Sequence, residues 1–191
     1  MASGGTLRFA PAAPQHVPAL AALHADAPDP WAATQLQAEL DKPECRAFVV
    51  FQDGAPAGFA CFCLLGDTAE LETMAVARAL RGQGLGAALL RRALADLRRQ
   101  GAARCLLEVR CSNVPAKALY RRLGFEPLAL RRGLFSAPRE DGETMQLVFD
   151  SAPAPEKGGG EQREEKEKKA ALSGSGECPR RHGAGGESER C

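Results

Sequence analysis

Residues 74–86 read Met-Ala-Val-Ala-Arg-Ala-Leu-Arg-Gly-Gln-Gly-Leu-Gly, where a predicted strand, 70–76, leads through a glycine-rich loop into a helix predicted over 84–99. The first N–H groups of a helix have no carbonyl partner within it, and the helix dipole attracts anions to that end. Glycines let the backbone approach a phosphate closely, and Arg81 adds a positive charge at the same place. The segment therefore predicts a diphosphate site made by Arg81, Gly82, Gln83, Gly84, Leu85 and Gly86.

Other glycine-rich loops fit this segment less well. A nucleotide P-loop ends in Gly-Lys-Ser/Thr, whereas Gly86 is followed by Ala87 and Ala88. The dinucleotide fingerprint matches the glycines, but it requires an acid that closes the next strand, and Glu108 lies inside its predicted strand. A tight turn without a ligand is the remaining alternative.

Hydrophobic periodicity on either side of the loop predicts an α/β fold. Apolar runs and alternation predict strands at 7–9, 47–51, 58–65, 70–76, 105–109, 127–130 and 145–149. Helical spacing of apolar residues predicts helices at 17–24, 32–40, 84–99 and 115–123. Asp53-Gly54 predicts a hairpin turn after the second strand. The order of these elements predicts a mixed central sheet flanked by helices on both faces.

Composition divides the 191 residues into a domain, 1–150, and a tail, 151–191. The tail holds eight Lys or Arg, eight Asp or Glu and eight Gly, and Leu172 is its only large apolar side chain. Such a segment buries too little apolar surface to offset the entropy of ordering it. We therefore expect a disordered, charged tail, for which the sequence does not identify a partner.

Charge and cysteine usage narrow the class of protein. The formal net charge of +1 argues against a nucleic-acid or membrane-surface partner. No apolar run approaches the roughly 20 residues needed to cross a bilayer, and the N-terminus does not resemble a secretory signal. We expect a cytoplasmic protein whose seven Cys are mostly free thiols. The spacings of Cys61 with Cys63, and of His16 with His24, predict no metal site.

Two segments together resemble the GNAT N-acetyltransferases. Arg81-x-x-Gly-x-Gly86 opening a helix after a strand is similar to their acetyl-CoA loop, and Asn113-Val-Pro-Ala-Lys-Ala-Leu-Tyr-Arg-Arg-Leu-Gly-Phe125 is similar to their second half. Leu107-Glu-Val-Arg-Cys-Ser-Asn113, Pro30-Trp31 and Arg131-Arg132 resemble the RimI-type ribosomal-protein-alanine N-acetyltransferases within that superfamily. The resemblance covers about residues 7–149. It implies a GNAT fold, acetyl-CoA as cosubstrate without a metal, and direct acetyl transfer to a protein N-terminal amine, such as the N-terminal alanine of a ribosomal protein.

The chemistry of amine acetylation gives these residues roles. A mid-strand carboxylate at Glu108, between apolar neighbours, suits a general base, and the resemblance implies the same role. The alternative is an ion pair of Glu108 with Arg104 or Arg110 on a solvated face.

Tyr120, the only tyrosine, matches the general acid that protonates the departing thiolate. Glu70 and Glu72 are the other candidate bases, although salt bridges on a wet face would also explain them. For the pantetheine arm, the resemblance implies backbone groups of Met74, Ala75 and Val76, together with Asn113.

One departure limits the resemblance at the acceptor groove. RimI-type enzymes carry two adjacent tyrosines after the Arg-Arg pair, whereas this chain has Leu134 and Phe135. We expect these two residues and Trp31 to line the acceptor groove, without the tyrosine hydroxyls. A lysine or a small amine is therefore an alternative acceptor. A non-catalytic CoA-binding module is the alternative of another class, but it would need neither Glu108 nor Tyr120.

Overall fold

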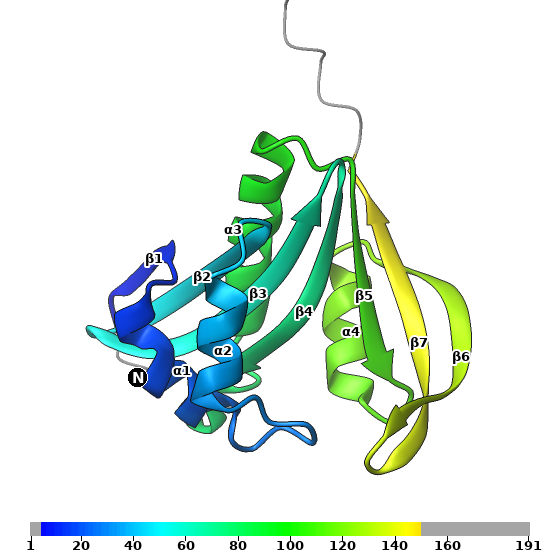
Figure 1. The fold of residues 1–191 in the computed structure, drawn as a ribbon, viewed down its shortest axis with the longest axis horizontal. Coiled ribbons are helices and arrows are strands. Elements are labelled where there is room, and N and C mark those ends of the chain that lie inside the picture. The colour runs from blue at the N-terminus through cyan, green and yellow to red at the C-terminus, as the bar shows by residue number, and fades with distance from the viewer. Residues whose placement is uncertain (1–4, 150–191) are drawn as a thin grey trace, which may run out of the picture. The chain divides into compact units, whose positions relative to one another are not determined.

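A seven-stranded mixed sheet forms the centre of the described part of the chain, with strand order β1-β2-β3-β4-β5-β7-β6 (Figure 1). The computed structural model describes residues 5–149, so the predicted tail at 151–191 lies outside the described residues. The strands are β1 Leu7–Pro11, β2 Cys45–Gln52, β3 Ala55–Leu65, β4 Thr68–Val76, β5 Arg104–Arg110, β6 Glu126–Ser136 and β7 Arg139–Val148. All neighbouring strands are antiparallel except β4 and β5, which are parallel.

Helices cover both faces of this sheet, as the sequence predicts. The helical segments are α1 Val17–His24, α2 Ala33–Leu40, α3 Leu85–Arg99 and α4 Val114–Arg122, with short 3-10 turns η1 Pro14–His16 and η2 Arg78–Leu80. Leu20 of α1 and Leu36 of α2 pack with Phe59 of β3 in one apolar cluster. Leu89 of α3 and Tyr120 of α4 belong to a second, larger cluster. This mixed sheet with helices on both faces is the architecture that the sequence predicts.

The long helix α3 is held by one apolar stripe. Its inward positions are 6% exposed or less and comprise Leu85, Leu89, Leu90, Ala93, Leu94 and Leu97. Burying one leucine side chain contributes about 1.5–3 kcal/mol relative to leaving it in water. The arginines at 91, 92, 98 and 99 are exposed, which matches the predicted polar face. This packing fixes the position of the helix N-terminus.

The β2–β3 hairpin and the β6–β7 hairpin differ in how well the sequence predicts them. Asp53 and Gly54 adopt φ values of 50° and 85°, the two positive values of a tight hairpin turn, which confirms the prediction. The predictions 127–130 and 145–149 were too short, because β6 and β7 extend well into polar sequence. The β6–β7 register shifts between Arg131 and Phe135, where Gly133 has φ 61°, so a bulge carries the strand past the Arg-Arg-Gly segment.

Strands β4 and β5 pair at one end and diverge at the other. Only Thr68–Leu71 of β4 pairs with β5, through Arg104–Leu107. Beyond this point the two strands separate (Figure 1). Cys61 and Phe62 of β3 pair with Thr73 and Leu71, so Glu72 is the extra residue of a bulge in β4. The outer end of β4 therefore faces β5 without a strand partner on that side.

Candidate active site

The glycine loop ends at a helix N-terminus whose N–H groups lack partners within the helix. The first helical bond of α3 runs from the N–H of Ala88 to the carbonyl of Gly84 at 3.0 Å. The N–H groups of Leu85, Gly86 and Ala87 precede that bond, and no side chain caps the helix. Gly84 has φ 82°, a conformation that an L side chain rarely adopts. This backbone arrangement suits a bound anion.

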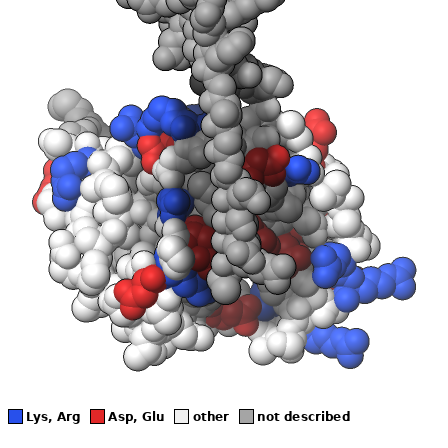
Figure 2. Space-filling view, turned by 45° about the horizontal axis from the view of Figure 1, so that its top comes forward, with Lys and Arg blue, Asp and Glu red and all other residues white. Residues whose placement is uncertain are grey.

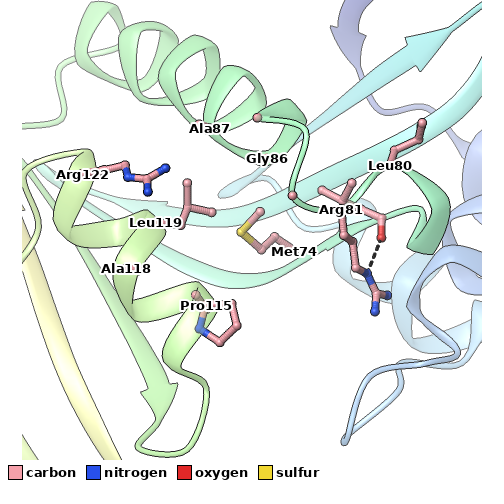
Figure 3. Close-up of a pocket in the computed structure, with 13 residues that line it drawn as sticks. Met74, Leu80, Arg81, Gly86, Ala87, Pro115, Ala118, Leu119 and Arg122 are labelled. Atoms are coloured by element: carbon pink, nitrogen blue, oxygen red, sulfur yellow. Dashed lines mark hydrogen bonds between the residues drawn. The ribbon is translucent and has the colours of Figure 1, made fainter. Parts of the chain in front are cut away.

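A pocket of about 460 Å³ opens over this loop, as Figure 3 shows. Met74, Val76 and Leu119 give it an apolar floor between β4 and α4. Arg81 reaches back to β4, where its Nε donates to the carbonyl oxygen of Val76 at 3.0 Å. A phosphate-bearing chain with an apolar arm fits such a lining better than a purely polar ligand. We call this space the phosphate-loop pocket.

The predicted cofactor residues fall into two groups. Met74, Val76, Arg81, Gly82, Gly84 and Gly86 line the phosphate-loop pocket. The side chains of the others point elsewhere. Gln83 donates to the carbonyl of Ala79 at 2.8 Å, Leu85 is buried in the core, and Ala75 packs with the cluster of α1 and α2. Leu85 still offers its backbone N–H at the helix terminus.

Asn113 caps the helix that follows β5. Its Oδ1 accepts a hydrogen bond from the N–H of Ala116 at 3.2 Å. Because the oxygen is used in the cap, the amide nitrogen remains as the donor that a ligand would meet. Asn113 lines a second pocket rather than the phosphate-loop pocket. Its predicted contact with the pantetheine arm therefore remains a prediction.

The second pocket, of about 290 Å³, collects the predicted catalytic groups. Glu72 of β4, Glu108 of β5 and Tyr120 of α4 all line it. Met74 lines both this pocket and the phosphate-loop pocket, so the two spaces meet at that side chain. A thioester held along the first pocket would place its reactive end near the carboxylates and the phenol. We call the second space the acceptor pocket.

Tyr120 is held in its neutral form. Its side chain is 6% exposed and packs near Phe125, with ring centroids 5.8 Å apart. Burial, and to a smaller extent the nearby Cys105 thiol, raise the pKa of Tyr120 to about 12. No hydrogen bond to its hydroxyl is formed within residues 5–149. A phenol that stays protonated, borders a pocket and has no committed partner is suited to donate a proton.

Glu108 does not form either of the ion pairs that the sequence suggests. Its Oε1 lies 3.6 Å from Nη1 of Arg131 on β6. Arg104 pairs with Asp67 instead, and Arg110 pairs with acids outside β5. The Glu108 side chain is 35% exposed and Arg131 is 57% exposed, so this pair is accessible to solvent. The carboxylate is therefore open to an incoming amine.

Glu72 is a carboxylate of the acceptor pocket whose pKa is shifted by burial. Desolvation in the concave site raises its pKa above the ordinary glutamate value, and the charges of Glu70, Glu39 and Glu108 add to that effect. Figure 2 shows several acidic side chains near the middle of the view, with Lys and Arg both beside them and towards the edges. Glu70 does not line the acceptor pocket, whereas Glu72 does. The bulge in β4 separates the two candidate bases.

His24 and Thr73 were missed as residues of the acceptor pocket. His24 is 4% exposed, its Nδ1 accepts from the backbone N–H of Trp31 at 2.8 Å, and its Nε2 lies 2.8 Å from Oγ1 of Thr73. Burial lowers the pKa of His24, so the ring is neutral and Nε2 carries the donated proton. The network ties Trp31 to β4. Only the inward position of His24 on its predicted helix signalled this role.

Arg110 has a role that the sequence did not reveal, since the sequence indicates it only as a possible partner of Glu108. Its guanidinium donates to Asp29 at 2.6 Å, to the carbonyls of Ala137 and Pro138 at 3.0 and 2.9 Å, and to Glu140 at 3.4 Å. It also stacks on Phe135, with Cζ 4.3 Å from the ring centroid. One buried side chain thus joins the α1–α2 loop to the β6–β7 hairpin.

The expected acceptor residues are only partly brought together. Trp31 and Phe135 line the acceptor pocket. The Leu134 side chain lies against Gly142 of β7 instead. Within the described residues, no group of three or more His, Cys, Asp or Glu is placed to hold a metal ion. No helix among residues 5–149 is both long enough and apolar enough to cross a membrane.

Comparison with known proteins identifies the class. Residues 17–125 match the model of the acetyltransferase (GNAT) family. The chain belongs to this family and is an acetyl-CoA-dependent N-acetyltransferase.

Two relatives and one solved structure are similar to this chain over much of its length. The ribosomal protein bS18-alanine N-acetyltransferase of Escherichia coli (strain K12) is 40% identical over 102 residues, which are 53% of this chain and 68% of that protein. The N-alpha-acetyltransferase RimI of Mycobacterium tuberculosis is 36% identical over 122 residues, which are 62% of this chain and 75% of that protein. The crystal structure of the ribosomal-protein-alanine N-acetyltransferase from Escherichia coli superposes with a TM-score of 0.72 and 30% identity, covering 78% of this chain and 97% of that one.

Proposed function

We propose that the protein acetylates the α-amine of a protein N-terminus, in the manner of the RimI-type enzymes, with the N-terminal alanine of a ribosomal protein as the acceptor. The observation that carries this proposal is the junction of the two pockets at Met74, which joins an anion-binding loop to a site with the carboxylates of Glu72 and Glu108 and a neutral tyrosine. The names of the relatives support the same acceptor class. A ribosomal acceptor would meet the enzyme in the cytoplasm.

The cosubstrate is proposed to lie along the phosphate-loop pocket. Its diphosphate meets the free N–H groups at the start of α3, and its arm follows Met74 and Val76 towards the acceptor pocket. The end of β4 lacks a strand partner beside β5, so its backbone groups are available to the arm and to the thioester carbonyl.

The proposed reaction is direct transfer between the two bound substrates. An α-amine has a pKa of about 8, so roughly a tenth of it is neutral at pH 7 and a weak base suffices. Glu108 accepts the proton from the amine, directly or through water, as nitrogen attacks the thioester carbon. The C–S bond then breaks, and the Tyr120 hydroxyl protonates the departing thiolate. Its pKa of about 12 keeps this proton in place until the thiolate forms.

The charge of the acceptor pocket supports a cationic substrate. Glu72 and Glu108 line the pocket, and their negative charges favour the protonated amine on arrival. Arg131 beside Glu108 gives that carboxylate a partner before the acceptor enters. An amine that displaces Arg131 would meet the base directly.

A small amine is the second candidate acceptor. Phe135 presents a ring without a hydroxyl to the pocket, and Leu134 is not among the residues that line it. A groove with fewer hydrogen-bonding groups discriminates less strongly among acceptors. The choice of acceptor therefore decides between the two functions within one enzyme class.

The deciding experiment measures thiol release from acetyl-CoA with a panel of amines. The panel holds peptides that begin with Ala, Ser, Gly or Met, a peptide with one internal lysine and a blocked N-terminus, and polyamines. Mass spectrometry then locates the acetyl group on each product. Acetylation of the Ala peptide at its α-amine is expected. Turnover with polyamines alone would favour the second candidate, and acetyl-CoA binding without turnover on any acceptor would favour a binding module.

A further inference from the structure

Arg122 lies at the edge of the phosphate-loop pocket, in the last turn of α4. Pro115, Ala118, Leu119 and Arg122 recur at the three- and four-residue spacing of one helix face, and all four line this pocket. Figure 3 shows the Arg122 side chain directed into the space between α3 and α4. A helix face made of small and apolar residues that ends in an arginine suits a ligand with an apolar arm and an anionic end.

The charges around the pocket have one sign. Of the described residues, the ionisable side chains that line it are Arg81 and Arg122, and no acid lies among them. Arg81 is committed to the loop, because its Nε donates to Val76 and its Nη2 lies 4.0 Å from Asp26. Arg122 forms no hydrogen bond or ion pair with any residue of 5–149. Its five donors are therefore free for a ligand.

The neighbouring arginine provides the contrast. Arg121 is also in the last turn of α4, but its Nη2 lies 3.8 Å from Glu143 and it does not line the pocket. Both arginines interact equally with the helix dipole at the C-terminal turn. Stabilisation of α4 therefore does not explain why Arg122 lines the pocket while lacking a partner.

We propose that Arg122 binds a phosphate group of the cosubstrate, either the 3′-phosphate or the diphosphate of CoA, and so selects the nucleotide thioester over a bare pantetheine thioester. A guanidinium pairs with phosphate through two parallel hydrogen bonds, which a lysine does not reproduce. The free N–H groups at the start of α3 bind one phosphate group, and Arg122 supplies a second contact across the pocket. This inference rests on the proposed use of acetyl-CoA and deepens it.

The test is calorimetric binding of three thioesters to the full chain: acetyl-CoA, 3′-dephospho-acetyl-CoA and acetyl-pantetheine. Arg122→Gln is expected to weaken acetyl-CoA binding about tenfold, because the pair is charged but partly exposed to solvent. Arg122→Lys should recover only part of that loss. Arg121→Gln, which removes the same charge one residue away, should change the affinity less than twofold.

The three ligands distinguish the two phosphate sources. A loss confined to acetyl-CoA assigns the contact to the 3′-phosphate, and an equal loss with the dephospho compound assigns it to the diphosphate. The inference is overturned if Arg122→Gln behaves as Arg121→Gln does, or if acetyl-pantetheine loses affinity by the same factor. Failure of the unmodified protein to bind acetyl-CoA at all would instead contradict the proposed function.

Discussion

The phosphate-loop pocket and the acceptor pocket adjoin at Met74, yet they are built in different ways. The first uses backbone N–H groups and glycines of one loop, with α4 as its other wall, so its anion site depends mainly on the local conformation of that loop. The second uses side chains from the α1–α2 loop, β4, β5, α4 and the β6–β7 hairpin, which tertiary packing brings together. In the proposed function, the cosubstrate therefore meets mainly local backbone geometry, whereas the acceptor meets side chains from elements that are distant in the sequence.

The largest expected effect is on the first pocket. Gly84→Glu places a carboxylate at the anion site and forces an L residue to φ 82°, so acetyl-CoA affinity should fall about 100-fold or more. Titration calorimetry measures the affinity, and circular dichroism checks the fold. Gly54→Glu is the matched control, because Gly54 has φ 85° in a hairpin turn away from both pockets. Equal affinity in the two variants would contradict the loop assignment.

A second variant is expected to affect the reaction in the acceptor pocket and to leave binding in the phosphate-loop pocket unchanged. Tyr120→Phe removes the proposed general acid and keeps the ring, so kcat should fall about 100-fold while the Kd for acetyl-CoA is unchanged. The hydroxyl forms no hydrogen bond within residues 5–149, so thermal stability should change little. Stopped-flow measurement of thiol release gives kcat, and calorimetry gives the Kd for acetyl-CoA. An unchanged kcat would rule out Tyr120 as the acid.

Glu108→Gln tests the proposed base, with a smaller expected effect. We expect kcat/KM for the acceptor peptide to fall about tenfold at pH 7, because much of the driving force comes from the neutral amine itself. The loss should shrink as pH rises above about 8, where the amine is already deprotonated. Glu70→Gln is the control, since Glu70 is on the same sheet face and does not line the pocket. A loss that is independent of pH would point to a positioning role instead.

The smallest effect concerns the pH response of acceptor binding. Desolvation raises the pKa of Glu72, so on lowering the pH this carboxylate takes up its proton earlier than an ordinary glutamate does. Its attraction for the cationic amine is therefore present at neutral pH and lost as the pH falls through the raised value. The ratio of kcat/KM for wild type to that for Glu72→Gln should be a few-fold at pH 7 and approach one as the pH falls below the raised pKa of Glu72. Taking the ratio cancels the titration of the amine, and a ratio that does not change with pH would contradict the prediction.

The sequence predicts the first pocket better than the second for a physical reason. A strand, three glycines and a helix leave a local signature, and the structure places the loop at the start of α3 as expected. The ends of β6 were missed because Arg131, Arg132 and Gly133 resemble a loop, while a bulge carries the strand through them. Pairing with β7, and not the local sequence, determines that strand.

The partners of the charged residues on β5 could not be predicted from the sequence either. Sequence alternation places Arg104, Glu108 and Arg110 on one face of β5, and near neighbours were therefore the expected partners. Instead Glu108 meets Arg131 of β6, and Arg110 meets Asp29, 81 residues away. Glu108 reaches Arg131 past β7, which lies between β5 and β6, and Asp29 belongs to the α1–α2 loop. Such contacts depend on the tertiary arrangement, which the spacing within one strand does not reveal.

Arg110 has a consequence for how the acceptor pocket opens. The guanidinium holds Asp29 from one wall, and Ala137, Pro138 and Glu140 from the other, so neither wall separates without disturbing the same buried group. Segments joined in this way unfold locally as one cooperative unit. Amide protons of the α1–α2 loop and of the β6–β7 hairpin should therefore exchange with solvent at matched rates, although about a hundred residues of chain lie between them. Arg110 therefore couples the opening of the α1–α2 loop to that of the β6–β7 hairpin.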